Sequence, residues 1–321
     1  MDHDILATLF NPGILFFLLG VIAKLLHSNL EIPEPILKFV SLYLMLSIGF
    51  KGGVSLHHAP LFGDGLRIIG FILFMSALVP AVTFVLLRGR FGAADAAAIG
   101  ATFGSNSTLT YITAVGFLTS IGVAFGGYMT VALVVMETPA IILSILLARA
   151  FGNRSRGPAR LGAVLRSALT DGTVIVLVGS LVIGYLLVAL GEEANPLAAF
   201  ISGDMFTGLL IFFLMYMGLQ VGGQLRGMRG FPPLLVVYAI AVPIVNGALA
   251  FGFSRAAGLQ PGDAYLLILL CASASYIVAP VLLREGLPEA NPARYLTMSM
   301  AIAFPLNIVV GIPAWWWLVT L

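Results

Sequence analysis

Long apolar stretches follow one another along almost the whole chain, with only short polar connections between them. Of the 321 residues, 60% are hydrophobic and 9% are charged, and the mean hydropathy is +1.06. So few polar side chains cannot cover the surface of a soluble globule of this size. Because a helix satisfies its own backbone hydrogen bonds in lipid, the sequence predicts an all-α polytopic membrane protein.

The apolar stretches can be counted as membrane spans. A helix needs about 20 mostly apolar residues to cross the hydrocarbon core of a bilayer. On this measure the sequence predicts ten transmembrane helices, of which the second and seventh are short. They run approximately over Leu6 to His27, Ile36 to Phe50, Leu66 to Leu87, Ala94 to Phe117, Ile121 to Arg149, Gly172 to Leu190, Met205 to Leu219, Leu234 to Phe253, Ala264 to Leu283 and Tyr295 to Leu321.

The basic residues support this count and suggest an orientation. With ten spans, odd-numbered and even-numbered connections lie on opposite sides of the membrane. Only Lys51, Arg67 and Arg255 of the 16 Lys and Arg residues lie beside even-numbered connections. Since cytoplasmic connections carry the excess of positive charge, we expect both termini on the outer side. The net charge of +2 therefore indicates orientation and not nucleic-acid binding.

Two apolar stretches are interrupted near their middle by small polar residues. The first break is Gly104-Ser105-Asn106-Ser107-Thr108, and the second is Ser273-Ala274-Ser275-Tyr276. At membrane depth, an interrupted helix is tolerated only where it lines a cavity that protein encloses or water fills. Broken helices at the midplane are typical of secondary transporters, which hold their cargo there.

The two breaks lie in matching halves of the chain. Ser105 and Ser275 are separated by the same offset as Gly52-Gly53 and Gly222-Gly223, and Leu44-Met45 recurs at that offset as Leu214-Met215. Five spans per half is an odd number, so the second half must enter the membrane upside down. The sequence thus predicts two inverted five-helix repeats, whose broken helices cross at the midplane. The predicted division is residues 1–151, a short basic cytoplasmic linker at 152–166, and residues 167–321.

The residue types in the breaks indicate which ligands they suit. Helix N-termini that converge on one place attract an anion. Hydroxyl and amide groups can donate to a small oxyanion, while hydroxyl oxygens and freed carbonyl oxygens can coordinate sodium. The candidate substrate-binding residues are Gly104, Ser105, Asn106, Ser107, Thr108, Ser273, Ala274, Ser275 and Tyr276. The candidate ion-coupling residues are Glu137, Ser105, Ser273 and Ser275. Sodium is the only metal expected, and no cofactor is expected.

Two acidic residues within or beside spans need a partner. Glu137 precedes Thr138-Pro139 in the fifth span, where an ionised carboxylate costs about 2.5 to 3.5 kcal/mol. It could be a sodium ligand, a proton acceptor, or a group that holds the broken fourth span in place. Asp95 lies near a span entrance, and we expect it to cap that helix beside Arg88 and Arg90.

The sequence lacks the motifs of two classes of membrane enzyme, the ATP-hydrolysing transporters and the intramembrane serine proteases. It contains no Gly-x-x-x-x-Gly-Lys-Ser/Thr loop for ATP hydrolysis. All four histidines precede residue 60, so none lies in a later span as the base of an intramembrane serine protease. We therefore expect a protein that is not an enzyme.

Several motifs across most of the chain are similar to those of one family. They are Ile32-Pro33-Glu34, Ile48-Gly49-Phe50-Lys51-Gly52-Gly53, Gly104-Ser105, Glu137-Thr138-Pro139-Ala140, the stretch from Ser273 to Pro280, and the stretch from Leu283 to Pro292. Through these motifs the chain resembles the sodium-dependent bicarbonate transporter family. The resemblance implies a ten-span inverted-repeat carrier, a homotrimer in the bacterial inner membrane, that imports bicarbonate with sodium. It also implies a core domain that moves against a scaffold and, in some members, an inhibitory PII-like protein at the cytoplasmic face.

Two positions depart from the family pattern. Tyr276 follows the serines of the second break where the pattern has an aspartate, and Glu137 stands where an aspartate is expected. The first hypothesis is a secondary active transporter that imports a small anion, with bicarbonate and sodium as the transported pair. The alternatives are a carrier for another small carboxylate or oxyanion, a channel, and a non-transporting membrane sensor whose site Tyr276 blocks.

Overall fold

The computed structural model describes residues 12–58, 63–152, 162, 166, 169–170, 172–191, 201, 203–226, 228 and 230–321. Within these ranges every regular element is a helix, which confirms the predicted all-α class. The helices are α2 Pro12–Leu25, α3 Glu34–His58, α4 Asp64–Phe91, α5 Ala93–Gly104, α6 Thr108–Ser120, α7 Tyr128–Phe151, α9 Gly172–Ala189, α11 Asp204–Arg226, α12 Pro233–Ala257, α13 Pro261–Ala272, α14 Val278–Gly286, α15 Pro292–Leu296, α16 Phe304–Leu306 and α17 Ile312–Thr320. The π-helical segments Thr297–Ala303 and Asn307–Gly311 join α15, α16 and α17 into one rod.

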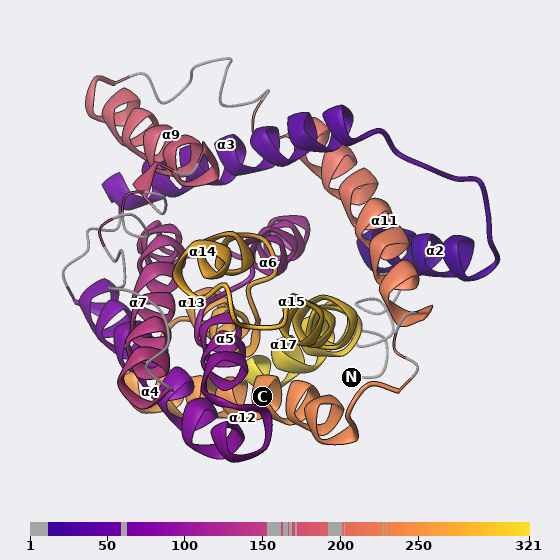
Figure 1. The fold of residues 1–321 in the computed structure, drawn as a ribbon. Helices are drawn as coiled ribbons and strands as arrows, with labels where there is room; N and C mark the ends of the chain where they lie inside the picture. The colour runs from indigo at the N-terminus through magenta and orange to yellow at the C-terminus, as the bar shows by residue number, and fades with distance from the viewer. Residues whose placement is uncertain are drawn as a thin grey trace.

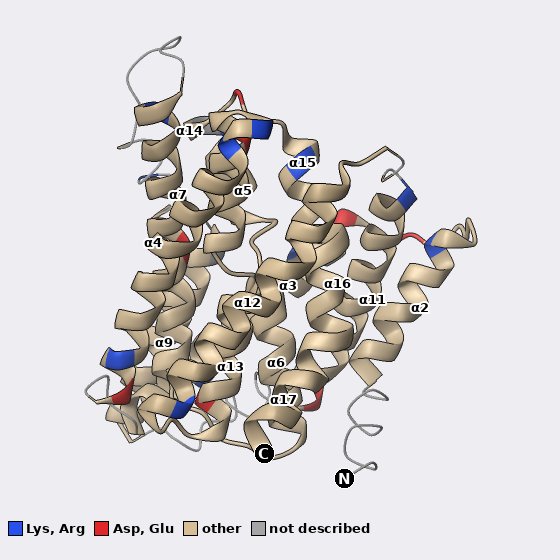
Figure 2. Ribbon diagram, turned by 90° about the horizontal axis from the view of Figure 1, so that it is seen from below, with Lys and Arg blue, Asp and Glu red and all other residues tan. Residues whose placement is uncertain are grey.

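Among the described helices, six are long and apolar enough to cross a membrane, namely α3, α4, α7, α11, α12 and the rod Pro292–Thr320. Shorter apolar helices include α2 and α13. In Figure 2 the helices run mainly from one end of the molecule to the other, and charged residues gather near the two ends. This distribution agrees with a multi-pass membrane protein. Residues 6–11 of the first predicted span, and most of the predicted linker 152–166, lie outside the described residues.

The second and seventh predicted spans are longer in the structure than in the prediction. Helix α3 continues to His58, and α11 continues to Arg226. Each helix runs through its glycine pair, and α3 also runs through Lys51. Glycine and lysine lower the hydropathy, so a prediction from hydropathy ends the span there. The helix itself continues, because it packs against a neighbouring helix, α9 for α3 and α2 for α11.

The helices separate into two groups, which we name the arc and the bundle. The arc consists of α2, α11, α3 and α9, which follow one another around the upper and right sides of Figure 1. Within it, α2 packs along α11, and α3 packs along α9. The bundle contains the remaining helices, with α5 packed between α4 and α7, and α13 packed on α12. Both groups combine helices from the two halves of the chain.

Glycines bring the arc helices into backbone contact. A Cβ atom at Gly20 or Gly218 would collide with a carbonyl oxygen of the opposite helix in the α2–α11 pair. Gly53 and Gly184 are packed in the same way in the α3–α9 pair. Small residues at crossings are the usual way in which membrane helices approach closely, since lipid provides no hydrophobic force between them.

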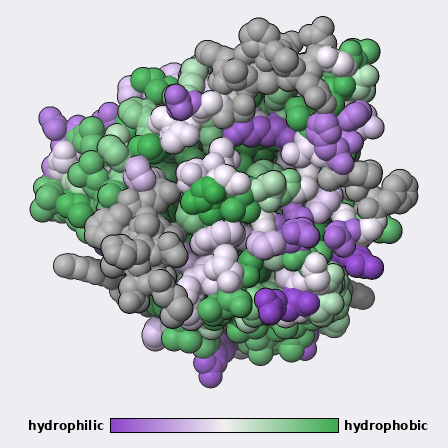
Figure 3. Space-filling model, turned by 180° about the vertical axis from the view of Figure 1, so that it is seen from behind, coloured by the Kyte–Doolittle hydropathy of each residue, from purple (hydrophilic) through white to green (hydrophobic). Residues whose placement is uncertain are grey.

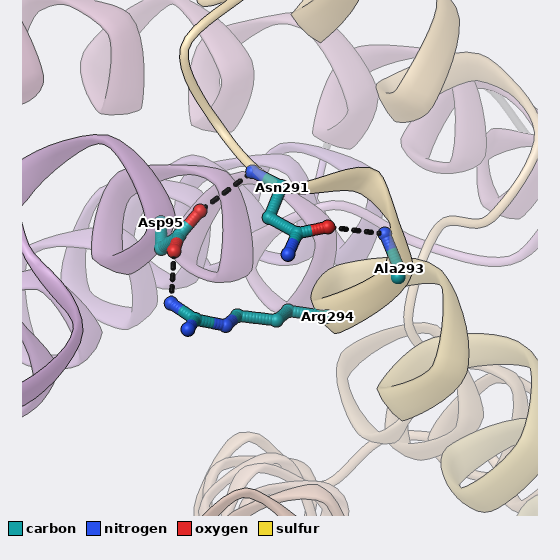
Figure 4. Close-up of polar contacts among 4 residues, drawn as sticks. All are labelled: Asp95, Asn291, Ala293 and Arg294. Atoms are coloured by element: carbon teal, nitrogen blue, oxygen red, sulfur yellow. Dashed lines mark hydrogen bonds and ion pairs between the residues drawn. The ribbon is translucent and has the colours of Figure 1, made fainter. Parts of the chain in front are cut away.

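An ion pair ties the start of α5 to the start of α15 (Figure 4). Arg294 donates to one carboxylate oxygen of Asp95, and the Asn291 N–H donates to the other at 2.6 Å. The side-chain oxygen of Asn291 accepts from the Ala293 N–H at 3.0 Å and so caps α15. The prediction that Asp95 acts beside Arg88 and Arg90 is therefore wrong, because its partner comes from the other half of the chain.

A second aspartate makes the corresponding tie for the other broken helix. Asp263 lies in the first turn of α13, as Asp95 lies in the first turn of α5. Its carboxylate accepts from the Gly126 N–H at 2.7 Å and from the Tyr128 hydroxyl at 2.5 Å, at the start of α7. Each broken helix is thus fastened to a helix that follows the break in the opposite half.

A pair of alanine variants tests the importance of close packing in the arc. We expect Gly218→Ala to destabilise the protein by about 1–3 kcal/mol, because its methyl group would overlap the backbone of α2 at Phe17. Gly223→Ala is the matched control on the same helix, since the nearest atom to its Cβ is Lys24 Cε at 3.8 Å. Thermal unfolding in detergent would measure both, and equal midpoints would contradict this account of the arc.

Candidate functional site

The two predicted breaks are real interruptions of the helices, and they touch each other. Helix α5 ends at Gly104 and α6 begins at Thr108, while α13 ends at Ala272 and α14 begins at Val278. The N–H of Ser107 donates to Ser273 Oγ at 2.9 Å, across 166 residues of sequence. In this way a backbone group that the first break frees from its helix finds a partner in the second break.

The contact is made in both directions. The N–H of Ser275, in the second break, donates to the carbonyl oxygen of Thr102 in the last turn of α5 at 2.8 Å. Each break therefore satisfies a polar backbone group of the other. A buried backbone group without a partner would cost roughly 1–3 kcal/mol, so the two breaks stabilise each other.

Serines in the breaks also start the helices that follow. Ser107 Oγ accepts from the Thr110 N–H at 3.2 Å, and Ser275 Oγ accepts from the Ala279 N–H at 3.1 Å. Side-chain oxygens in this role satisfy N–H groups that have no partner in the first turn of a helix. The same serines that interrupt the apolar stretches therefore define where α6 and α14 begin.

Two asparagines hold the ends of the breaks. Asn106 Nδ2 donates to the carbonyl oxygen of Leu133 on α7 at 2.7 Å. Asn307 Nδ2 donates to the carbonyl oxygen of Ala272, the last residue of α13, at 2.8 Å. Asn307 was not among the predicted site residues, although an isolated asparagine in an apolar span is a signal that could have identified it.

A small cavity of about 10 Å³ lies where the two breaks meet. Its walls come from both breaks, from the starts of α6 and α14, and from α7. The lining residues are Asn106, Ser107, Thr108, Glu137, Ser275, Tyr276, Ile277 and Val278. This volume holds roughly one water molecule.

The structure brings together some of the predicted site residues and not others. Asn106, Ser107, Thr108, Ser275 and Tyr276 line the cavity together with Glu137. The remaining four candidates, which do not line it, are Gly104, Ser105, Ser273 and Ala274.

Gly104 has a packing role. A Cβ atom there would lie 2.5 Å from the Pro80 ring of α4 and 3.2 Å from Ala140 Cβ of α7. The absence of a side chain thus lets α5 pass closely between these two helices, just before its last turn ends.

The cavity contains features that favour both signs of charge. The N-termini of α6 and α14 reach it at Thr108 and Val278, and helix N-termini favour an anion. Glu137, with 7% of its surface exposed, brings a carboxylate to the same walls, which favours a cation. No Lys, Arg or His occurs among the described residues that line the cavity.

Two oxygen atoms of the first break are available for a ligand. Ser105 Oγ and Asn106 Oδ1 are buried and make no hydrogen bond within the described part of the chain. No group of three or more His, Cys, Asp or Glu side chains suited to a metal occurs among the described residues. Hydroxyl, amide and backbone oxygens are therefore the ligands that these breaks can offer to a hard monovalent cation.

Tyr276, which lines the cavity, packs against a second aromatic ring. The Tyr276 ring packs edge to face against Phe304, with a centroid distance of 5.1 Å and an interplanar angle of 66°. Phe304 also packs edge to face against Phe17 of α2, at 5.8 Å. The second break is thereby connected, through two aromatic contacts, to the arc.

Replacing one serine tests the contact between the breaks. We expect Ser273→Ala to destabilise the protein by about 1–3 kcal/mol, because it leaves the buried Ser107 N–H without an acceptor. The matched control is Ser254→Ala, since the buried Ser254 hydroxyl bonds only to the Ala250 carbonyl of its own helix, at 2.7 Å. Thermal unfolding of both variants in detergent provides the measurement. An equal effect of the two substitutions would show that the contact does not hold the breaks together.

The comparison with protein families finds a match. The model of the Na+-dependent bicarbonate transporter superfamily matches residues 12–320, nearly the whole chain. The comparison with curated proteins finds no match.

Proposed function

The chain belongs to the Na+-dependent bicarbonate transporter superfamily, and from this premise we propose that it is a secondary active carrier that imports bicarbonate together with sodium. The resemblance inferred from the sequence motifs is thereby confirmed. The transported anion, the coupling to sodium and the transport cycle are the content of the proposal.

The proposal rests mainly on one observation: the same cavity has groups that favour an anion and a group that favours a cation. The N-termini of α6 and α14 favour an anion, and the Glu137 carboxylate favours a cation. When both ions are present, each offsets the charge that would oppose binding of the other. This mutual stabilisation is a coupling free energy between the two ligands, and such coupling links their transport when only the doubly loaded or empty carrier crosses readily.

The hydrogen bonds suggest which candidate residues bind bicarbonate and which bind sodium. Ser107, Thr108 and the start of α14 would donate to bicarbonate, while Glu137, Ser105 Oγ and Asn106 Oδ1 would supply oxygen ligands for sodium. The hydroxyls of Ser273 and Ser275 already bond to backbone groups. Their proposed role is to position the breaks during binding.

The size of the cavity implies that binding requires movement. Bicarbonate is larger than a water molecule, and the cavity of about 10 Å³ has room for roughly one water. Tyr276 is the largest side chain in its wall, and its ring rests on Phe304 of the rod. We propose that the described conformation is a closed, substrate-free state and that Tyr276 shifts against Phe304 when the anion enters.

The proposed architecture has ten spans in two inverted repeats, with the arc as scaffold and the bundle as moving core. The reciprocal packing of α2 with α11 and of α3 with α9 supports it, as do the corresponding ties of Asp95 and Asp263. We further propose outward-facing termini in a bacterial inner membrane, on the distribution of basic residues and the family resemblance. The homotrimer and a PII-like partner at the cytoplasmic face rest on that resemblance alone.

One observation favours a second candidate function, a sensor that binds an anion without moving it. Tyr276 stands where the family pattern has an aspartate, and it helps to close the cavity. A sensor would bind a small carboxylate or oxyanion without flux. Under this alternative, Tyr276→Ser would create flux that the unmodified protein lacks, whereas a carrier already has it.

Uptake of radiolabelled bicarbonate into proteoliposomes tests the proposed function. At fixed pH and membrane potential, we expect saturable uptake that requires an inward sodium gradient. Saturable uptake independent of sodium would contradict the coupling. Binding of bicarbonate without uptake, by protein shown to be folded, would favour the sensor.

Replacing the acidic residue of the cavity tests the sodium site. We expect Glu137→Gln to raise the sodium concentration for half-maximal uptake by about ten- to a hundredfold, because a lost charged ligand is worth roughly 1.5–3 kcal/mol. Glu34→Gln is the control, since Glu34 lies in the exposed first turn of α3. An unchanged sodium dependence of the Glu137 variant would remove this residue from the coupling site.

A further inference from the structure

Lys51 is a charged residue inside a candidate membrane span, and the cavity of the breaks does not use it. A lysine within a span costs up to about 2.5–3.5 kcal/mol on insertion scales, a value that applies at the helix centre, so its position needs an explanation. Its Nζ atom is buried and makes no hydrogen bond within the described part of the chain. The ammonium group lies instead over the ring of Phe206 on α11, 4.4 Å from the ring centroid.

Lys51 lines a second and larger cavity, which we name the Lys51 cavity. Its volume is about 460 Å³. One wall consists of four α3 residues, and the other consists of Thr119 at the end of α6 and residues 122–125, which follow that helix. The α3 residues are Phe50, Lys51, Val54 and Ser55. The cavity thus lies between the arc and the bundle, and it shares no lining residue with the cavity of the breaks.

The Lys51 cavity is electrostatically one-sided. Lys51 is the only charged residue among the described residues that line it, and none of them is an aspartate or glutamate. It lies at the end of the molecule where α6 ends, which Figure 3 views along the bundle. White and purple side chains cross the centre of that face, and green ones line its left and lower margins. On the orientation inferred from the basic residues, this is the outer end.

The present partner of Lys51 is weaker than an anion would be. A cation over an aromatic ring is stabilised by about 0.5–2 kcal/mol. A hydrogen bond between ionised groups contributes about 1.5–3 kcal/mol and leaves less of the charge unsatisfied. An anion in the cavity would therefore compete successfully with the Phe206 ring for the ammonium group.

We propose that the Lys51 cavity is a second anion site, in which the Lys51 ammonium leaves the Phe206 ring to bind a small inorganic oxyanion such as bicarbonate. The inference rests on the proposed function, because it gives this site the role of collecting the transported anion before the cavity of the breaks opens. The ring of Phe206 holds the lysine in a low-energy position when no anion is present.

Cysteine modification tests the site without requiring transport. Ser55→Cys places a thiol in the Lys51 cavity, and Cys271→Ala removes the buried native cysteine. The measurement is the ratio of the modification rates by an anionic and a cationic methanethiosulfonate reagent. We expect Lys51→Gln to lower this ratio at least about threefold, because the site loses the charge that concentrates anions.

Three further variants control the interpretation. Lys51→Arg should keep the ratio high, because it keeps the charge. Phe206→Leu should raise the ratio, because it frees the ammonium from the ring. A thiol at exposed Gln260, which does not line the cavity, should show no effect of Lys51→Gln. If Lys51→Gln leaves the ratio at Ser55→Cys unchanged in folded protein, or changes it equally at both thiols, the anion site is refuted.

Bicarbonate itself completes the test. We expect added bicarbonate to slow modification of Ser55→Cys in a saturable way, and to do so less in the Lys51→Gln background. Lys51→Gln should also raise the bicarbonate concentration for half-maximal uptake. Charge selectivity and protection without any uptake would support the site and refute the carrier. Sodium-dependent uptake without charge selectivity or protection would support the carrier and refute the site.

Discussion

The structure depends on a rule of the lipid environment, that every backbone N–H and carbonyl group needs a partner inside the protein. Two helices violate the regular pattern that would satisfy this rule. They do so next to each other, so that the Ser107 N–H bonds to Ser273 and the Ser275 N–H bonds to the Thr102 carbonyl. Each break region thus provides an acceptor for a backbone N–H of the other. The cavity lies where the two breaks meet, and polar residues of both breaks line it.

The same rule explains why the polar residues of the breaks have different roles. Ser273 and Ser275 are committed to backbone groups, and Asn106 uses its amide nitrogen to hold α7. The amide oxygen of Asn106 and the hydroxyl of Ser105 remain for a ligand. A single short segment therefore combines rigid support with unused hydrogen-bonding capacity, which is the combination that a selective and reversible ion site requires.

The sequence was sufficient for some of these features and insufficient for others, for physical reasons. Both breaks could be predicted, because a cluster of small polar residues within an apolar span indicates an interrupted helix that lines a cavity. Glu137 was assigned to the same site because an ionisable residue in a span needs a partner inside the protein, and it does line the cavity. The hydrogen bonds between the breaks could not be predicted, since they depend on how the helices on either side of each break pack together. Asp95 was assigned to nearby basic residues because sequence distance was the only guide, whereas its partner Arg294 is 199 residues away. The lengths of α3 and α11 were underestimated because neighbouring helices stabilise them beyond the point where hydropathy falls.

The tie between Asp95 and Arg294 also has a consequence for biosynthesis. The chain is made from its N-terminus, and 199 residues separate the two partners. At 5–20 residues per second, roughly 10–40 s pass between their syntheses. During that interval the carboxylate lacks its guanidinium partner, so this tie between the two halves cannot form. The contacts of α5 with α4 and α7 can therefore form first, and the contact of α5 with α15 is added to them later.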